Sequence, residues 1–320
     1  MNINCFVSEK LYRFERHYQK ENLGKSKYLM IKRDCGSSPL GLFAYFITNV
    51  AWIEYALRKN YIPVIDMQNF QNVYHKEGEV GKVNTYDYFF KQPAGIGVEE
   101  ALASGKARYV WKDIPDFHPN ESLDFFLNQE IVEYYREIVK KYVVFQDDVK
   151  EHLEKVRKEI LGEEGEKRIL GVLARGTDYT SLKPYFHPVQ PAVEELIEKI
   201  DSYKEKYHCQ KVYVATEDEN ILQQLSRKYG EDLLYYNQKR VQATDTFLNY
   251  NKEFVGVEPK KNGLDYLTSI YLLSKCNGLI AGRTSGTVGT MLLADNYEFF
   301  HIFSKGRYGV EEEILSSRVL

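Results

Sequence analysis

One short segment of the sequence places an arginine, a glycine and a carboxylate directly after an apolar run. The run is Ile169–Leu173, and Arg175, Gly176 and Asp178 follow it. A guanidinium can hold a phosphate through two parallel N–H donors, and an adjacent glycine lets the backbone approach closely. Asp178 could orient Arg175 or accept a proton; alternatively, the two form a structural ion pair in a turn. His187, which precedes a proline, is either a second proton acceptor or a partly buried loop histidine.

A second segment follows another apolar run and has residue types that contact nucleotides. Thr216, Glu217 and Asp218 come directly after Val212–Ala215. Their side chains could hydrogen-bond a base or a ribose. The spacing of Thr216 and Glu219 also matches a capping box, which would be a purely structural role.

The third segment is Gly282-Arg283-Thr284-Ser285-Gly286, between an apolar run and a helical pattern. Backbone N–H groups and the dipole at the start of a helix favour a phosphate. Arg283, Thr284, Ser285 and Gly286 are therefore candidate donor-binding residues. The alternative is that Thr284 or Ser285 serves only as a helix N-cap.

The pattern around these three segments predicts a parallel sheet covered by helices on both faces. Apolar runs of strand length alternate with segments of helical periodicity, which is typical of α/β folds. Such sheets bind ligands at the carboxyl ends of their strands, where all three segments fall. The predicted strands are 169–173, 212–215, 233–236, 279–281 and 298–303, and the predicted helices are 193–200, 221–225, 264–275 and 286–293.

The first half of the chain predicts a second α/β unit. Strands are expected at 28–31 and 61–65, with a helix over 42–57 between them. Residues 67–120 have weak periodicity and are expected to form long loops broken by short elements, and 123–160 are expected to be helical. Because a charged, glycine-containing stretch ends near Gly165, and one hydrophobic core rarely serves this length, we expect two domains. Their boundaries are 1–165 and 166–320.

The composition excludes several classes of partner. The chain has 43 Lys+Arg against 46 Asp+Glu, a formal net charge of −3, which gives no basic field for nucleic acid or an anionic membrane. Its 4 cysteines lack paired spacing, so neither a zinc site nor a disulfide framework is expected. No carboxylate pair lies beside the three segments, so we expect no metal. The start lacks a signal-peptide pattern and no apolar run predicts a membrane span, so a cytoplasmic location is expected.

Three motifs in this order resemble those of the GDP-fucose-dependent fucosyltransferase superfamily. They are LARGTDY followed by FHP, then VYVATEDENIL, then SIYLLSKCNGLIAGRTSG, over about residues 169 to 290. The similarity is greatest to the α-1,6-fucosyltransferases. The resemblance implies a GT-B architecture, in which two Rossmann-like domains with parallel sheets face a cleft, the donor lies on the C-terminal domain and the acceptor lies mostly against the N-terminal one. It also implies metal-free, inverting transfer.

The resemblance also implies residue roles. Arg175 matches the arginine that grips the β-phosphate of GDP-fucose, Asp178 the acidic residue that follows it, and His187 the histidine of the family's Phe-His pair. The implied catalytic residues are Arg175, Asp178 and His187, and the implied donor-binding residues are Arg175, Gly176, His187, Thr216, Glu217, Asp218, Asp265, Arg283, Thr284, Ser285 and Gly286.

The chain departs from the family pattern at several positions. Leu173 stands where the Arg motif opens with histidine, Gly176 replaces its second arginine, and Lys183 stands at the glutamate proposed as base in the α-1,6 enzymes. The acid that reads guanine falls near Ser269, and Asp265 lies one helical turn earlier. The identities of the base and of the donor sugar therefore stay open.

We therefore predict a glycosyltransferase of polysaccharide biosynthesis that moves fucose from GDP-fucose to a glycan or a lipid-linked oligosaccharide. Arg175 would neutralise the departing GDP, and Asp178 or His187 would deprotonate the acceptor hydroxyl. One alternative is a transferase that uses another nucleotide sugar. The other is a catalytically silent glycan or nucleotide-sugar binding protein, since the family's glutamate and second arginine are missing. The acceptor, the linkage and the oligomeric state are left open.

Overall fold

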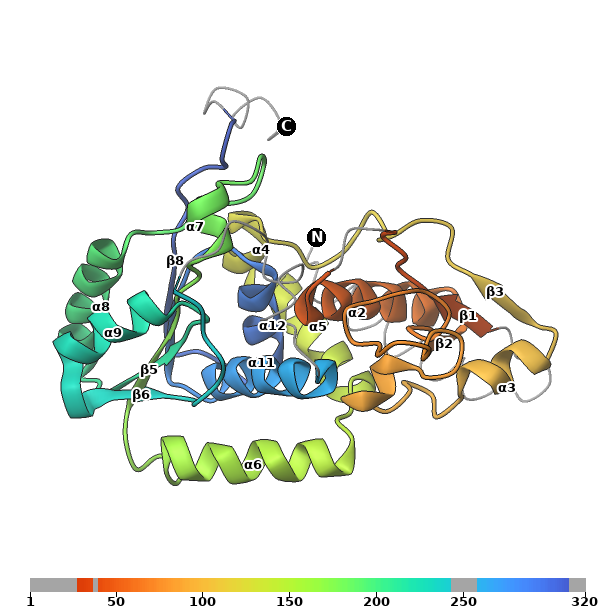
Figure 1. The fold of residues 1–320 in the computed structure, drawn as a ribbon, viewed down its shortest axis with the longest axis horizontal. Coiled ribbons are helices and arrows are strands. Elements are labelled where there is room, and N and C mark those ends of the chain that lie inside the picture. Colours follow the sequence, from red (N-terminus) through yellow and green to blue (C-terminus); the bar gives the residue numbers. More distant parts are fainter. Residues whose placement is uncertain (1–27, 37–39, 243–257, 311–320) are drawn as a thin grey trace. The chain divides into compact units, whose positions relative to one another are not determined.

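The computed structural model describes residues 28–36, 40–242 and 258–310, and Figure 1 shows its ribbon. The described residues form two compact units. One contains the described chain up to Asn120 together with Leu127–Lys150, and the other contains Glu121–Phe126 together with the described chain from Glu151. The sequence places the boundary at residue 165, whereas the contacts place most of helix α6 (Asp147–Leu161) in the second unit. The roles assigned to the two domains stay predictions.

The first unit is built on a small parallel sheet. Its three strands have the order β2-β1-β3, and β1 pairs in parallel with both neighbours. The elements of this unit are β1 (Tyr28–Ile31), α2 (Leu42–Arg58), β2 (Ile62–Ile65), the 3-10 helix η1 (Thr85–Tyr88), α3 (Val98–Ala103), β3 (Ala107–Tyr109) and α5 (Gln129–Tyr142), while most of α4 (Leu123–Leu127) belongs to the second unit. The predicted strands at 28–31 and 61–65 and the helix between them are confirmed. The prediction of long loops broken by short elements over 67–120 is confirmed, since only η1, α3 and β3 interrupt this stretch. The sequence did not place β3 itself, because Ala-Arg-Tyr is a short, mostly exposed edge strand without an apolar run.

The second unit contains a five-stranded parallel sheet with the order β6-β5-β4-β7-β8. The predicted strands and helices of this half are confirmed, with helices longer than their apolar periodicity indicated. The elements are β4 (Ile169–Leu173), α7 (Asp178–Leu182), α8 (Val193–Tyr207), β5 (Lys211–Ala215), α9 (Glu219–Tyr229), η2 (Gly230–Asp232), β6 (Leu233–Tyr235), α11 (Pro259–Ser274), β7 (Gly278–Ala281), α12 (Ser285–Leu293) and β8 (Phe299–Ile302). The α/β fold class with two parallel sheets is therefore confirmed.

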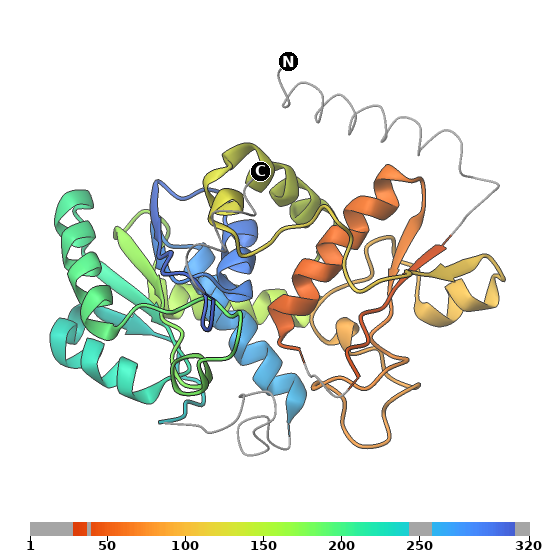
Figure 2. The same cartoon turned by 90° about the horizontal axis from the view of Figure 1, so that it is seen from above.

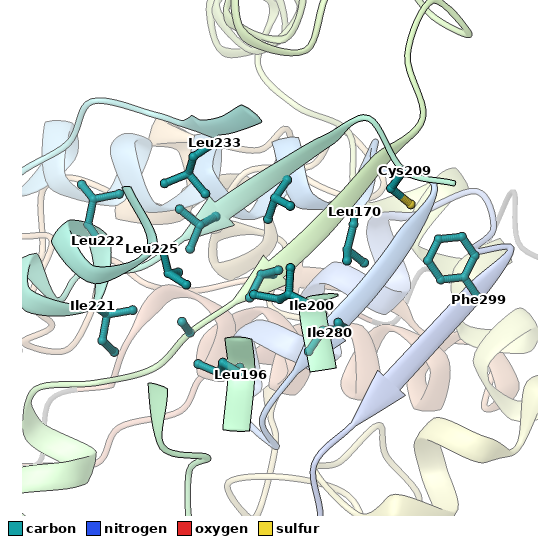
Figure 3. Packing of buried hydrophobic residues seen from close by; sticks show 14 residues of the cluster. Leu170, Leu196, Ile200, Cys209, Ile221, Leu222, Leu225, Leu233, Ile280 and Phe299 are labelled. Atoms are coloured by element: carbon teal, nitrogen blue, oxygen red, sulfur yellow. The ribbon is translucent and has the colours of Figure 1, made fainter. Parts of the chain in front are cut away.

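The core of the second unit follows from the two-residue period of its central strand. Leu170 and Val172 lie in one apolar cluster with residues of α8 and α9, such as Ile200 and Leu225. Figure 3 shows these side chains packed on one face of the strands. On the other face a Cβ at Gly171 would lie 3.1 Å from the Leu273 side chain of α11. In Figure 2, α8 and α9 (green and teal) accordingly lie on one side of the sheet and α11 and α12 (blue) on the other.

The strand order also determines where a ligand would bind. From the central strand β4 the chain moves outward to β5 and β6, then returns to the other side of β4 for β7 and β8. The loops after β4 and β7 therefore leave toward opposite faces of the sheet. In open α/β sheets ligands bind at the carboxyl ends of the strands beside this point of reversal. These are the loops that carry Arg175 and Arg283.

Within the described ranges, no helix is long and apolar enough to cross a membrane. Cys35, Cys209 and Cys276 are free thiols, and Cys5 lies outside the described residues.

Candidate functional site

The centre of the site is an ion pair between the loops that follow β4 and β5. These strands are neighbours, with Leu173 opposite Ala215 in the ladder, so the residues two positions beyond each strand end are brought together. Nη1 of Arg175 lies 2.8 Å from Oε1 of Glu217, and the two side chains are 20% and 9% exposed. Glu217 is thus a carboxylate partner of Arg175. The proposed pair with Asp178 stays a prediction, since α7 begins at that residue but its side chain lies outside what the structure describes.

An aromatic ring joins this ion pair to the candidate histidine. The guanidinium carbon of Arg175 lies 4.9 Å from the centroid of the Tyr179 ring. The Tyr179 ring in turn meets the His187 ring edge-on, with centroids 5.4 Å apart and planes at 83°. A cation over an aromatic face is stabilised by the ring quadrupole. Sequence reasoning missed Tyr179 as a site residue, although it closes the LARGTDY motif.

The backbone between these residues is strained. Thr177, Lys183 and Phe186 have φ values of 46°, 45° and 66°. Positive φ is rare outside glycine and is costly for a β-branched residue such as Thr177, so surrounding bonds must hold it. Thr177 is 1% exposed, and its N–H donates to Oδ2 of Asp218 at 2.9 Å. Strain of this kind clusters at functional sites.

Asp218 ties the loop after β4 to the loop after β5. Its Oδ2 accepts from Thr177, and its Oδ1 accepts from the N–H groups of Asn220 and Ile221 at 2.9 and 3.1 Å, which caps α9. The capping box proposed for Thr216 and Glu219 was therefore wrong. Thr216 Oγ1 instead accepts from the N–H of Asp218 at 3.1 Å, so the helix begins two residues after the position that the spacing predicted.

The same carboxylate explains why position 176 is a glycine. A Cβ at Gly176 would lie 2.3 Å from Oδ2 of Asp218, which is closer than any real Cβ contact. No arginine side chain can start from this position while Asp218 keeps its place. The absence of the family's second arginine is therefore coupled to the bond between the two loops.

Arg240 supports the loop after β5 through hydrogen bonds to backbone carbonyls. Arg240 donates from Nε to the carbonyl of Thr216 at 3.2 Å and from Nη2 to the carbonyl of Tyr236 at 2.6 Å. Burial lowers the pKa of the Arg240 guanidinium from its usual value. Thr216 itself is 1% exposed, so the loop is packed and braced. Sequence reasoning had no motif that marked Arg240.

The loop after β7 is held by a carboxylate that sequence reasoning also missed. Ser285 Oγ donates to Oε1 of Glu121 at 2.6 Å, and Arg283 Nε donates to the Glu121 carbonyl at 2.6 Å. Thr284 is the N-cap of α12, accepting from the N–H of Thr287 at 3.1 Å. Thr284 therefore caps α12, and its role as a donor-binding residue stays a prediction. Glu121 reaches this loop from 164 residues away in sequence, which no local pattern signals.

Burial also shifts the pKa of the arginine in this loop. It lowers the pKa of the Arg283 guanidinium, and the nearby positive charge of Arg307 lowers it further. Gly286 is buried in the first turn of α12. The loop therefore combines a helix N-terminus with the Arg283 guanidinium, and the Arg307 charge lies near it.

Gln190 connects the first loop with the third. It is 5% exposed, and its Nε2 donates to the carbonyls of Pro188 and Arg283 at 3.0 and 3.3 Å. The segment that contains His187 is thereby fastened to the start of α12. All three segments singled out in the sequence meet at one edge of the sheet.

Asp265 belongs to a separate polar group on α11. It is 8% exposed and accepts from the Tyr236 hydroxyl at 3.0 Å and from Lys261 Nζ at 2.7 Å. Ser269, one turn later, is 2% exposed, and its carbonyl accepts from the Tyr213 hydroxyl at 3.2 Å. The buried carboxylate in this part of α11 is therefore Asp265 rather than position 269, which is a serine. That Asp265 binds the donor nucleotide stays a prediction.

In the part of the chain that the structure describes, no three His, Cys, Asp or Glu side chains are grouped as a metal would need. The charged groups at this edge include the guanidinium groups of Arg175 and Arg283 and the carboxylates of Glu121, Glu217 and Asp218, beside the N-terminus of α12. Guanidinium groups and helix N-termini are the features that hold phosphate groups in α/β proteins.

The two α/β units, each with a parallel sheet, have the GT-B type of fold of the solved structures to which the chain is similar. No model of a known protein family matches the chain, and no curated protein matches it either. Its fold is that of GDP-fucose-dependent fucosyltransferases, which confirms the resemblance seen in the motifs at the level of the fold.

Three solved structures carry this likeness. Fucosyltransferase NodZ from Bradyrhizobium has a TM-score of 0.52 and 15% identity, over 83% of this chain and 93% of that one. POFUT1 in complex with GDP-fucose has a TM-score of 0.50 and 10% identity, over 89% and 99% of the two chains. FUT1 of Arabidopsis thaliana in complex with GDP has a TM-score of 0.50 and 11% identity, over 94% and 82%.

Proposed function

We propose that the protein transfers fucose from GDP-fucose to a hydroxyl group of a glycan or lipid-linked oligosaccharide. The observation that supports this most is the meeting of Arg175, Glu217, Tyr179 and His187 at the carboxyl edge of the second sheet. The similar structures of NodZ and POFUT1 were determined with GDP-fucose. Arg175 would hold the diphosphate, with the N-terminus of α12 as a second phosphate contact.

The chemistry proposed is a single displacement at the anomeric carbon. The acceptor oxygen forms a bond to that carbon while the bond to the β-phosphate oxygen breaks, so the configuration inverts. The acceptor proton passes to His187 or Asp178, and GDP leaves with the electron pair of the broken bond. The positive charge of Arg175 stabilises the developing charge on GDP, which is the main electrostatic task. Glu217 and the Tyr179 ring orient the guanidinium for it.

The proposal also covers the setting of the reaction. We expect a cytoplasmic protein that contributes to polysaccharide biosynthesis, with the acceptor mostly against the first unit and with peripheral contact to a membrane if that acceptor is lipid-linked. Neither a resident cofactor nor a metal ion takes part in the proposed step. Guanidinium groups can supply the positive charge that a metal would otherwise bring to a diphosphate.

GDP should raise the melting temperature of the protein more than UDP does, and a chelator should leave that shift unchanged. A ligand that binds only the native state stabilises it by about 2.7 kcal/mol at 100 times its Kd. Thermal unfolding with a panel of GDP- and UDP-sugars, each with and without EDTA, measures this. A GDP shift that EDTA abolishes and magnesium or manganese restores would contradict metal independence. A larger shift with another nucleotide would favour another donor.

Amide variants should identify the base. In Asp178→Asn and His187→Gln, loss of the base should lower turnover at saturating donor by about 100- to 10,000-fold, while the affinity for GDP survives. Only one residue can be the principal base, so we expect one variant to lose far more activity than the other. His301→Gln, in the same unit on β8, serves as the control and should keep its turnover. Near-normal turnover in both test variants would exclude both residues.

A further inference from the structure

Two large aromatic side chains next to the candidate histidine are exposed. Tyr185 is 74% exposed and Phe186 is 44% exposed, and both directly precede His187. Their ring centroids lie 6.2 Å apart with planes at 39°. Side chains of this size usually bury most of their area. Two neighbouring exposed rings at a candidate site therefore indicate a surface that a ligand covers.

The segment that carries these rings is hydrogen-bonded to the antiparallel segment around Tyr308. Phe186 donates its N–H to the Tyr308 carbonyl at 2.9 Å, and its own carbonyl accepts from Arg307 Nη1 at 2.7 Å. The Arg307 guanidinium carbon also lies 4.6 Å from the centroid of the Phe186 ring. Tyr185 rests against Gly309, where an added Cβ would lie 2.7 Å from its Cδ2 atom. The rings are thus exposed but anchored, which lowers the entropy lost when a ligand binds.

The position of the rings limits what can cover them. A general base must come within about 2.6 to 3.2 Å of the acceptor hydroxyl. One candidate base, His187, directly follows the two rings, and the other, Asp178, lies seven residues before Tyr185. An acceptor held at His187 would therefore lie near these rings. A pyranose ring has an apolar C–H face that matches an aromatic surface and hydroxyl groups at its rim. Arg307 and His187 supply polar groups that can face such hydroxyls.

We propose that Tyr185 and Phe186 form an acceptor subsite on which a pyranose ring stacks while its hydroxyl is presented to the base. This inference rests on the proposed glycosyl transfer and adds the chemical class of the acceptor, a hexopyranose unit, to it. The Tyr185 ring is the principal stacking surface, since it is the more exposed of the two. Its hydroxyl group is not required for stacking.

Saturation-transfer NMR on the full chain with saturating GDP tests the subsite. The probes are methyl pyranosides of the gluco, galacto, manno and N-acetylglucosamine series, used at high concentration while the protein aromatic protons are irradiated. Tyr185→Ala should weaken the affinity for the best probe by about 3- to 10-fold, and Tyr185→Phe should leave it within about 2-fold of the unchanged protein. Trp111→Leu, which removes a 58% exposed ring from the first unit, is the matched control.

The outcomes separate this subsite from the proposed function. GDP affinity, measured in the same samples, should be equal in all three variants; failure of GDP to bind would overturn the transfer reaction itself. The subsite is overturned if no pyranoside receives saturation from the unchanged protein, if Tyr185→Ala binds as well as Tyr185→Phe, or if only Trp111→Leu loses the signal. A Tyr185→Ala effect confined to the sedimentation coefficient would assign the rings to a protein contact instead.

Discussion

Arg175→Ala should lower the turnover of transfer from GDP-fucose by about 100- to 1,000-fold, and Arg175→Lys should be nearly as damaging. Removing one preorganised donor to a developing oxyanion costs about 2.7 to 4 kcal/mol of transition-state stabilisation. Lysine keeps the charge but loses the planar fork that can bind two oxygens at once. Lysine also lacks the flat guanidinium that contacts the Glu217 carboxylate at 2.8 Å and the Tyr179 ring at 4.9 Å at the same time. Turnover normalised to folded protein is the measurement.

The control for Arg175 is Arg168, which lies next to the opposite end of β4. Arg168 precedes β4 and forms an ion pair with Glu298 in which both side chains are exposed, at 38% and 47%. Exposed pairs contribute about 0 to 1 kcal/mol to stability, so Arg168→Ala should keep near-normal turnover. If Arg175→Ala is well folded and as active as Arg168→Ala, the phosphate role is refuted. A purely structural Arg175 would lower the melting temperature in both of its variants while the folded fraction stayed active.

Asp218→Ala should lower the free energy of unfolding by about 2 to 4 kcal/mol. Loss of a helix N-cap costs about 0.5 to 2 kcal/mol. The buried N–H of Thr177 would also lose its acceptor at 2.9 Å, which costs about 1 to 3 kcal/mol more. The free energy of unfolding of Asp218→Asn should lie between those of the unchanged protein and Asp218→Ala. The asparagine amide oxygen can still cap α9, whereas its NH2 group cannot accept from the Thr177 N–H. Denaturant unfolding of the three proteins measures this order.

The control for Asp218 is a helix N-cap residue at an exposed position, for which no bond to a separate loop is described. Asn128 caps α5 through the N–H of Ile131 at 3.1 Å, at an exposed position. Asn128→Ala should therefore cost about 1 kcal/mol. Equal losses in Asp218→Ala and Asn128→Ala would show that the bond to Thr177 contributes nothing. Because that bond holds the strained loop that leads to Asp178 and His187, Asp218→Ala should also lower turnover in the protein that remains folded.

The elements of the second unit follow from local pattern. Strands such as Ile169–Leu173 are continuous apolar runs of the right length, because a parallel strand is buried on both faces. The alternation of strands and helices, combined with the rule that ligands bind at the carboxyl ends of parallel strands, predicts Arg175, Glu217 and Thr284 at one edge of the sheet. Edge strand β3 escaped this reasoning because an exposed strand of three residues leaves no apolar signature.

Side-chain partners depended on the fold. An Arg175–Asp178 pair was one alternative from the sequence and stays untested, since the Asp178 side chain lies outside what the structure describes. The described partner of Arg175 is Glu217, which a neighbouring strand delivers from 42 positions further along the chain. No sequence motif marked Glu121 or Arg240. Glu121 supports the loop after β7 by accepting hydrogen bonds from Arg283 and Ser285. Arg240 supports the loop after β5 by donating to the Thr216 carbonyl. Such bonds join residues that are distant in sequence, so residue spacing carries no information about them.

The amino-acid sequence alone therefore determined the α/β class, the parallel sheet of the second unit and the three loops that carry charge, because burial and periodicity are local properties of the chain. Only the tertiary structure decided which residue caps α9, why Gly176 must lack a side chain, and which rings connect Arg175 with His187. Hydrogen bonds and ring contacts depend on distances of a few ångströms between separate loops. Those distances are set by how strands pair and helices pack, and no short stretch of sequence specifies them.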